Sequence, residues 1–232
     1  MRTLTVEHVH PGSVDDVRAE RMYDRVMVTA WQGSLLDLDD EVLIGPLGAG
    51  VQRRMLGAGA WVDVRPGWMH GADTLFQRLL TRVPWRAERR VMYDRTVDVP
   101  RLLSWYGEGD RLPDPGLDAA RDALNAHYAP VRLCTAGLCL YRDGRDSVAW
   151  HGDTLPPDSN GETVVAIVSV GAPRALLLRP RGGGPAIRYQ LGHGDLLVMG
   201  GTCQQTWEHA VPKSARAAGP RISIQFRPRG VH

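Results

Sequence analysis

Four short β-like runs follow one another in the segment ETVVAIVSVGAPRALLLRPRGGGPAIRYQLGHGDLLVMGG, residues 162–201. Glycine, proline or aspartate separates the runs, and no helical pattern lies between them. With one run before and one after, the β-like runs of the C-terminal half are Leu138–Tyr141, Thr163–Val170, Ala175–Leu178, Ile187–Gln190, Leu196–Met199 and Arg221–Phe226. Short, closely spaced strands of this kind predict an antiparallel sandwich or barrel.

Two helical patterns precede all six of these runs. Apolar residues recur on one face from about Ala72 to just before Pro84, and again from Asp114 or Pro115 to His127. Helices ahead of an all-β body predict a mainly β protein with flanking helices (α+β). We therefore predict a double-stranded β-helix, or jelly roll, supported on one side by helices.

The length of 232 residues predicts one large domain, at about 100–200 residues per domain. Residues 1–30 mix charge and polarity without a sustained period, so we expect a partly mobile N-terminal extension there. The domain then comprises residues 31–232. Within it we expect residues 31–135 to support the fold and residues 136–232 to form the jelly-roll core.

The composition excludes several classes of protein. Hydrophobic residues make up 43% and charged residues 23%, which is typical of a folded globular chain and not of a disordered, collagen-like or coiled-coil chain. The longest apolar runs are far shorter than the roughly 20 residues of a membrane helix, so we expect no membrane partner. No apolar signal-peptide core is visible in residues 1–30, and we expect a cytoplasmic protein.

Net charge and cysteine content limit which partners and cofactors the sequence can indicate. A net charge of +2 permits contact with a polyanion, but only a local basic patch could indicate one. The three cysteines, Cys134, Cys139 and Cys203, form an odd set without a CxxC pair. We therefore expect buried thiols, and neither disulfides nor a zinc site.

Three side chains are candidate metal ligands. His151 and Asp153 stand at i and i+2, which places them on the same side of an extended backbone. On its own, such a pair more often marks a solvent-facing loop. His209, however, follows the run Leu196–Met199 and falls near the end of a late strand, which a jelly roll brings beside the first pair. Two imidazoles and one carboxylate form the facial triad typical of non-haem Fe(II).

A polar strand face is the third element of the candidate site. The run RISIQFR alternates strictly, and its polar residues are Arg221, Ser223, Gln225 and Arg227. An edge strand with this face in water would explain the pattern. Beside a metal site, two guanidiniums instead suit a dicarboxylate, because arginine binds carboxylates through paired hydrogen bonds. A chelating 2-oxo acid fits that description.

The segments that carry these residues resemble the AlkB-type Fe(II)/2-oxoglutarate-dependent dioxygenases, a family that repairs alkylated nucleic acid. The resemblance covers about Gly59 to Pro228. It is strongest in Leu140–Gly144 with Trp150–Asp153, in Leu191–Gly200, in Trp207–Pro212 and in Arg221–Arg227. It implies Fe(II), 2-oxoglutarate and O2, with ascorbate as a reductant in vitro, and a substrate lid within residues 31–135.

The resemblance also implies a role for each matching residue. The implied iron ligands are His151, Asp153 and His209. The implied 2-oxoglutarate-binding residues are Tyr141, Arg221, Ser223 and Arg227, with Tyr141 and Arg221 at the distal carboxylate and Arg227 near the carboxylate at the metal. The family oxidises an N-alkyl group on a nucleobase, which leaves as an aldehyde, and 2-oxoglutarate becomes succinate and CO2.

Three positions depart from the family pattern. Cys139 and Ser223 replace asparagines that are common in the family, which removes amide contacts to the co-substrate. Leu155 stands where repair members carry an acidic residue that reads the base. The choice among alkylated bases therefore stays open.

Aromatic and basic residues are candidates for substrate binding, because an extruded base needs an aromatic surface and its backbone needs positive charge. The candidates within the implied lid are Trp85, Tyr93 and Trp105, with the cluster Arg86, Arg89 and Arg90 beside them. Arg179 and Arg181 follow the run Ala175–Leu178, at a position that matches a basic residue of the family's substrate pocket. A tryptophan after Val-Pro is as often part of a core, and an arginine cluster is usually solvated.

The resemblance implies action on alkylated nucleic acid, with DNA favoured over RNA, and we expect a monomer. Two alternatives stay open: a 2-oxoglutarate-dependent hydroxylase of a small metabolite or of protein, and a non-catalytic jelly-roll binding module. Retention of all three implied ligands and of both arginines argues against the binding module, because unused polar groups buried together would destabilise the domain.

Overall fold

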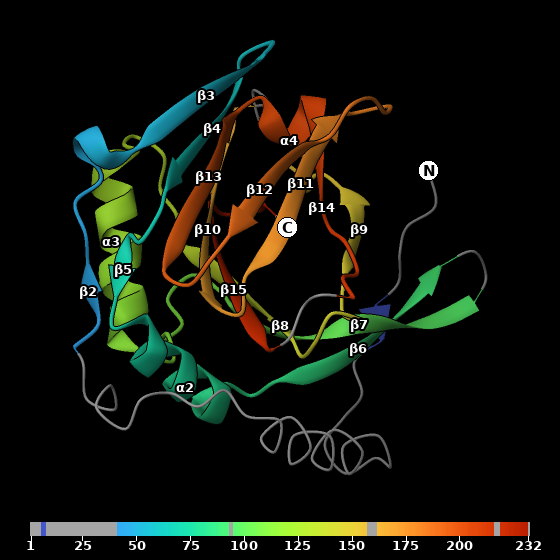
Figure 1. Cartoon of the computed structure of the whole chain (residues 1–232), viewed down its shortest axis with the longest axis horizontal. Coiled ribbons are helices and arrows are strands. Elements are labelled where there is room, and N and C mark those ends of the chain that lie inside the picture. Colours follow the sequence, from blue (N-terminus) through green and yellow to red (C-terminus); the bar gives the residue numbers. More distant parts are fainter. Residues whose placement is uncertain (1–5, 8–40, 93–94, 157–161, 216–218, 232) are drawn as a thin grey trace.

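The computed structural model describes residues 6–7, 41–92, 95–156, 162–215 and 219–231 (Figure 1). The strands are β1 (Val6–Glu7), β2 (Leu43–Ile44), β3 (Gln52–Gly57), β4 (Ala60–Arg65), β5 (Met69–His70), β6 (Arg86–Met92), β7 (Arg95–Tyr106), β8 (Thr135–Tyr141), β9 (Val148–His151), β10 (Thr163–Gly171), β11 (Arg174–Pro180), β12 (Ile187–Leu191), β13 (Asp195–Gly201), β14 (Trp207–Val211) and β15 (Arg221–Arg227). The helices are the 3-10 turn η1 (Gly48–Gly50), α2 (Ala72–Arg82), α3 (Pro115–His127) and α4 (Cys203–Thr206).

Two antiparallel sheets form the body of the molecule. The large sheet has the order β1-β6-β7-β8-β15-β10-β13-β4-β3, and the small sheet has the order β12-β11-β14-β9. The small sheet faces the central strands of the large one (Figure 1), and strands β2 and β5 pair separately. This arrangement confirms the predicted jelly roll with flanking helices.

The central strands are apolar on both faces because each face packs against a different layer. In β10, Val164, Ala166, Val168 and Val170 belong to the core beneath the helices, whereas Val165 and Ile167 belong to the core between the sheets. This is why the run from Thr163 is uninterrupted by polar residues except Ser169.

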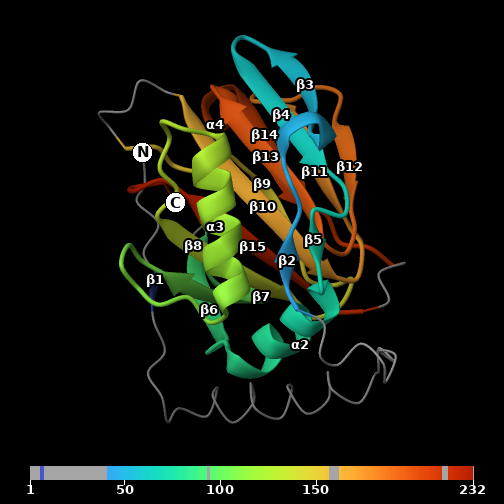
Figure 2. The ribbon, with the colours of Figure 1, turned by 90° about the vertical axis from the view of Figure 1, so that its left-hand side faces the viewer.

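The two predicted helices cover one face of the large sheet (Figure 2). Helix α2 contributes Leu75, Phe76 and Leu79 to the helix-side core. Helix α3 begins where Asp114 accepts a 2.9 Å hydrogen bond from the backbone N–H of Gly116, an N-cap that satisfies an otherwise unpaired donor. Both helices occur where the periodicity placed them.

All six predicted runs are strands, β8, β10, β11, β12, β13 and β15, but four strands gave no clear sequence signal. Strands β9 (VAWH) and β14 (WEHAV) show neither strict alternation nor a run of β-branched residues. Strands β6 and β7 form a long hairpin whose arginines and Pro100 hide the β pattern.

The boundary expected near residue 135 divides a continuous sheet. Strands β4 and β7 precede it, yet they pair directly with β13 and β8, which follow it. Val6 and Glu7, the described part of residues 1–30, pair with β6. Among the described helices, none has the length and apolar character needed to cross a membrane.

Candidate metal and co-substrate site

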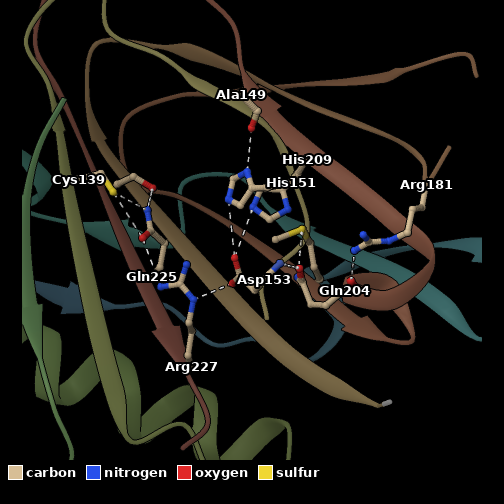
Figure 3. Close-up of polar contacts among 11 residues, drawn as sticks. Cys139, Ala149, His151, Asp153, Arg181, Gln204, His209, Gln225 and Arg227 are labelled. Atoms are coloured by element: carbon tan, nitrogen blue, oxygen red, sulfur yellow. Dashed lines mark hydrogen bonds and ion pairs between the residues drawn. The ribbon is translucent and has the colours of Figure 1, made fainter. Parts of the chain in front are cut away.

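Three predicted ligands come together at one end of the small sheet (Figure 3). Strands β9 and β14 are antiparallel neighbours, and their register places His151 directly opposite His209. The two imidazole centroids are therefore 4.2 Å apart. Asp153 follows β9 and turns its carboxylate toward both rings.

The donor atoms of this group converge. His151 Nε2 and His209 Nε2 lie 3.8 and 3.9 Å from Asp153 Oδ1. One ligand atom from each residue lies within 4.8 Å of the others. His151 Nδ1 lies 2.9 Å from the carbonyl oxygen of Ala149, which turns Nε2 toward the carboxylate. Two nitrogens and one oxygen in this arrangement suit a divalent transition metal.

The protonation states also fit a metal. Burial, with His151 and Arg227 nearby, lowers the pKa of His209 to about 3. Burial likewise lowers the pKa of His151. Burial alone would raise the pKa of Asp153, but Arg227 and the imidazoles overcome this and hold the pKa at about 2. At neutral pH the group therefore presents two neutral imidazoles and one carboxylate, the forms that bind metal.

Two residues hold Asp153 in place. Arg227 Nε donates a 2.7 Å hydrogen bond to Asp153 Oδ2, which leaves Oδ1 facing the imidazoles. The backbone N–H of Asp153 donates to Gln204 Oε1 at 2.8 Å. Sequence reasoning missed Gln204, a buried glutamine in the short helix α4, because only its place one turn before the strand of His209 could have indicated it.

Gly152, between the two ligands of the HxD segment, is required by close packing. A Cβ atom at this position would lie 2.6 Å from Arg181 Nη2 and 2.6 Å from the carbonyl oxygen of Gln204. Arg181 Nη2 itself donates to that carbonyl at 3.0 Å. A larger residue would push the segment away from α4 and displace Asp153.

The polar face of β15 points into the space between the sheets. Strand β15 lies between β8 and β10 in the large sheet, so the alternative of a water-exposed edge strand is excluded. Ile222, Ile224 and Phe226 pack under the helices. The opposite face carries Arg221, Ser223, Gln225 and Arg227, and three of these four residues are buried.

Gln225 links the two positions that depart from the family pattern. Its Nε2 donates to Ser223 Oγ at 2.8 Å and lies 3.5 Å from Cys139 Sγ. Cys139, Cys134 and Cys203 are buried free thiols, as predicted. Cys139 and Ser223 replace asparagines that are common in the family. The amide of Gln225 therefore lies in the region where those asparagine amides are missing.

Tyr141 lies between two buried arginines that differ in their partners. The guanidinium carbons of Arg174 and Arg221 are 5.4 and 5.3 Å from its ring centroid. Arg174 donates to the carbonyl oxygens of Asp143, Asp146 and Pro212 at 2.8–2.9 Å. Arg221 donates to Ser169 Oγ at 2.9 Å, and no carboxylate of the described residues forms an ion pair with it. Arg221 therefore retains the capacity to bind an anion.

Arg174→Ala is expected to lower the free energy of unfolding by about 3 kcal/mol, because it leaves three carbonyl oxygens without their donor. Urea denaturation measures the change. Arg145→Ala is the matched control, since its exposed side chain pairs with Asp143 of the same loop. Equal stability of the two variants would contradict the structural role of Arg174.

Trp85 and Arg179 do not lie at this site as predicted. Trp85 packs against the helix-side core, on the face of the large sheet opposite to the ligands, and we correct its predicted stacking role to a packing role. Arg179 donates to Glu208 Oε2 at 3.1 Å, and its guanidinium carbon lies 4.1 Å from the centroid of the Trp150 ring. These two contacts hold the Arg179 side chain on the outer face of the small sheet. Tyr93 lies outside the described residues. Leu155 packs against the core between the sheets.

Comparisons with known proteins agree with this geometry. Residues 69–227 match the 2OG-Fe(II) oxygenase superfamily. Human alpha-ketoglutarate-dependent dioxygenase alkB homolog 3 is 33% identical over an alignment that covers 97% of this chain and 87% of the human protein. The chain belongs to the AlkB-type 2OG-Fe(II) oxygenases. Two further relatives are bovine alkB homolog 3, at 35% identity over 69% of this chain, and Arabidopsis thaliana DNA oxidative demethylase ALKBH2, at 33% over 66%.

These two alignments span 64% and 61% of the respective relatives, somewhat less than two thirds of their length. Membership of the AlkB-type oxygenases identifies the chain as a 2-oxoglutarate-dependent dioxygenase with Fe(II) as its metal and O2 as its oxidant. The donor set of His151, Asp153 and His209 fits that metal.

Proposed function

We propose that this protein oxidatively dealkylates N-alkylated bases in nucleic acid, with DNA favoured over RNA. The observation that carries the proposal is the convergence of His151, Asp153 and His209 beside the polar face of β15, in a chain with DNA oxidative demethylases among its relatives. In the proposed reaction the N–C bond to the alkyl group breaks. One oxygen atom of O2 enters the aldehyde, and the other enters succinate as 2-oxoglutarate loses CO2.

We assign the metal to His151, Asp153 and His209. Bound Fe(II) supplies the redox chemistry that couples oxidation of 2-oxoglutarate to oxidation of the alkyl group. The protein's part is to hold the ligands before the metal binds. Arg227 orients one carboxylate oxygen of Asp153 and keeps the other available, and Ala149 orients the ring of His151.

We assign the distal carboxylate of 2-oxoglutarate to Arg221 and Tyr141. Arg221 is almost completely buried, and Ser169 holds its Nε, which orients the rest of the guanidinium. Ser223 lies on the same face of β15, between Arg221 and the Arg227–Asp153 pair, and is available to a ligand that extends from one arginine toward the other. Such binding would place a dicarboxylate along the strand with its keto end toward the metal ligands.

Water exclusion supports the same chemistry. The core between the sheets contains Ile167, Leu178, Leu197 and Met199, all buried. Apolar walls around a charged co-substrate strengthen its ion pair with Arg221 and keep solvent from the reacting centre.

A second candidate function is hydroxylation of a small metabolite or of protein. It is favoured by Leu155, which offers no charge where repair enzymes are expected to read the base, and by Arg179, whose charge Glu208 already balances. The two functions share the co-substrate site and differ only in what reaches it.

The test incubates the purified chain with Fe(II), ascorbate and 2-oxoglutarate and a pool of oligonucleotides that carry different N-alkylated bases. Mass spectrometry then follows the oligonucleotides and succinate together. We expect loss of alkyl groups with matching succinate, and neither with Asp153→Ala. Succinate without dealkylation would favour the metabolite or protein hydroxylase, and no succinate under any condition would favour a binding module.

A further inference from the structure

Arg181 follows the last residue of β11 and reaches toward the short helix α4 (Figure 3). Its backbone N–H donates to the carbonyl oxygen of Thr206 at 2.8 Å. Its side chain donates from Nε to the carbonyl oxygen of Gln205 at 2.8 Å and from Nη2 to the carbonyl oxygen of Gln204 at 3.0 Å. One arginine thus binds three consecutive carbonyl oxygens of α4.

These contacts complete the hydrogen bonding of the helix. A helix leaves its last four carbonyl oxygens without partners inside the helix, and α4 consists of four residues. The backbone N–H of Trp207 binds the carbonyl oxygen of Cys203, and Arg181 binds the other three. A planar guanidinium suits two neighbouring carbonyl oxygens, because its N–H groups have fixed directions. The helical form of α4 therefore depends on Arg181.

Helix α4 connects two of the metal ligands. Gln204 is 2% exposed, and its Oε1 accepts a 2.8 Å hydrogen bond from the backbone N–H of Asp153. The helix leads directly into β14, the strand that carries His209. It is thus bound to one ligand through a side chain and to another through the chain itself. A displaced α4 would release the backbone of Asp153.

The guanidinium also contacts the HxD segment. A Cβ atom added at Gly152 would lie 2.6 Å from Arg181 Nη2, so this nitrogen passes directly over the residue between His151 and Asp153. The same nitrogen donates to the carbonyl oxygen of Gln204. The guanidinium therefore lies between α4 and the segment with two ligands, and it fixes how closely they approach.

This arrangement differs from the substrate role that the sequence suggested for Arg181. The residue as a whole is exposed, but its Nε and Nη2 donate to α4 and are used within the protein. Arg179, two residues earlier, donates to Glu208 instead. Of these two arginines, Arg181 is the one connected to a metal ligand.

We propose that Arg181 is a positioning residue for the metal group, which holds α4 so that Gln204 keeps the backbone of Asp153 in place and the carboxylate faces the two imidazoles. This inference rests on the proposed assignment of the metal to His151, Asp153 and His209. Partners that orient metal ligands contribute about 10–100-fold to metal affinity or activity.

The test measures the Kd of the purified chain for Mn(II), without 2-oxoglutarate, by isothermal titration calorimetry. Arg181→Ala is expected to raise this Kd about tenfold or more. Arg181→Lys keeps the charge but lacks the planar fork that reaches two carbonyl oxygens, so it should also raise the Kd. Arg188→Ala is the matched control and should leave the Kd unchanged, because this exposed arginine of β12 donates to Gln190 of the same strand.

A double variant separates positioning from a general loss of structure. If Arg181 acts through Gln204, then Arg181→Ala should raise the Kd by less than about twofold when Gln204→Ala is already present. Circular dichroism checks that each variant is folded, and Arg181→Lys takes the place of Arg181→Ala in both comparisons if the alanine variant is not.

An unchanged Kd for Mn(II) in a folded Arg181 variant would overturn this inference and leave the metal assignment intact. Full additivity of the Arg181 and Gln204 substitutions would do the same. Equal binding of Mn(II) by the wild-type protein and by Asp153→Ala would overturn the metal assignment, and this inference with it.

Discussion

His209→Ala is expected to abolish the formation of succinate from 2-oxoglutarate. The substitution removes one of three converging donors, and the two that remain do not form a facial triad. Loss of a residue that only orients a metal ligand already lowers metal affinity or activity by about 10–100-fold. Loss of a ligand itself should therefore lower the rate of succinate formation by more than about 100-fold. Mass spectrometry of succinate in the presence of Fe(II) and ascorbate measures it.

His70→Ala is the matched control for this experiment. His70 is an exposed histidine on β5, which belongs to the separate two-stranded pair and not to the small sheet. Its replacement should leave succinate formation at the wild-type level. A His209→Ala protein that is folded, as judged by circular dichroism, and keeps more than about a tenth of the wild-type rate would contradict the assignment of His209 to the metal.

Arg221→Ala is expected to raise the KM for 2-oxoglutarate by about 100-fold, which corresponds to about 2.7 kcal/mol. Charge-assisted hydrogen bonds to a buried guanidinium contribute on this scale. Arg174, the other buried arginine over the Tyr141 ring, is held in place by three carbonyl oxygens. Succinate formation over a range of 2-oxoglutarate concentrations measures the change, and excess co-substrate should restore much of the rate.

Two comparisons separate this effect from a loss of structure. The KM for an alkylated oligonucleotide should change far less than the KM for 2-oxoglutarate. Arg229→Ala, which removes an exposed arginine paired with Glu108, should change neither. Arg221→Ala should also reduce the stability of the ligand-free protein less than Arg174→Ala, because Arg221 donates to Ser169 Oγ whereas Arg174 donates to three carbonyl oxygens. An unchanged KM for 2-oxoglutarate would contradict the assignment.

Much of the fold could be predicted because its local patterns are strong. The alternation in RISIQFR identified which face of β15 is polar, and the structure places that face between the sheets. The helices that begin at Ala72 and Pro115 followed from apolar periodicity and, for the second, from the start at Asp114 and Pro115. These features depend on residues close together in sequence.

The three metal ligands could be predicted for a different reason. His151 and Asp153 are two residues apart, so extended geometry alone places them on one side. His209 is distant in sequence, and only the expected jelly roll brought it near. The register of β9 with β14 is what sets the two imidazoles opposite each other.

The substrate side was predicted less well, because exposure and partners decide it. Trp85 and Trp105 are both tryptophans near the hairpin of β6 and β7, yet Trp85 packs under the helices and Trp105 stays exposed. Arg179 offered a basic side chain, but Glu208 and Trp150 occupy it. No local pattern distinguishes these cases.

By itself, the sequence determined the strand and helix periods, the chemical types of the metal ligands and their order along the chain. These features depend only on side-chain chemistry and on the geometry of residues that are close together in sequence. The tertiary structure alone decided which arginine beside Tyr141 is held by three carbonyl oxygens and which can bind an anion, and which tryptophan packs under the helices. The physical reason is that burial, register and hydrogen-bond partners come from strands that are far apart along the chain.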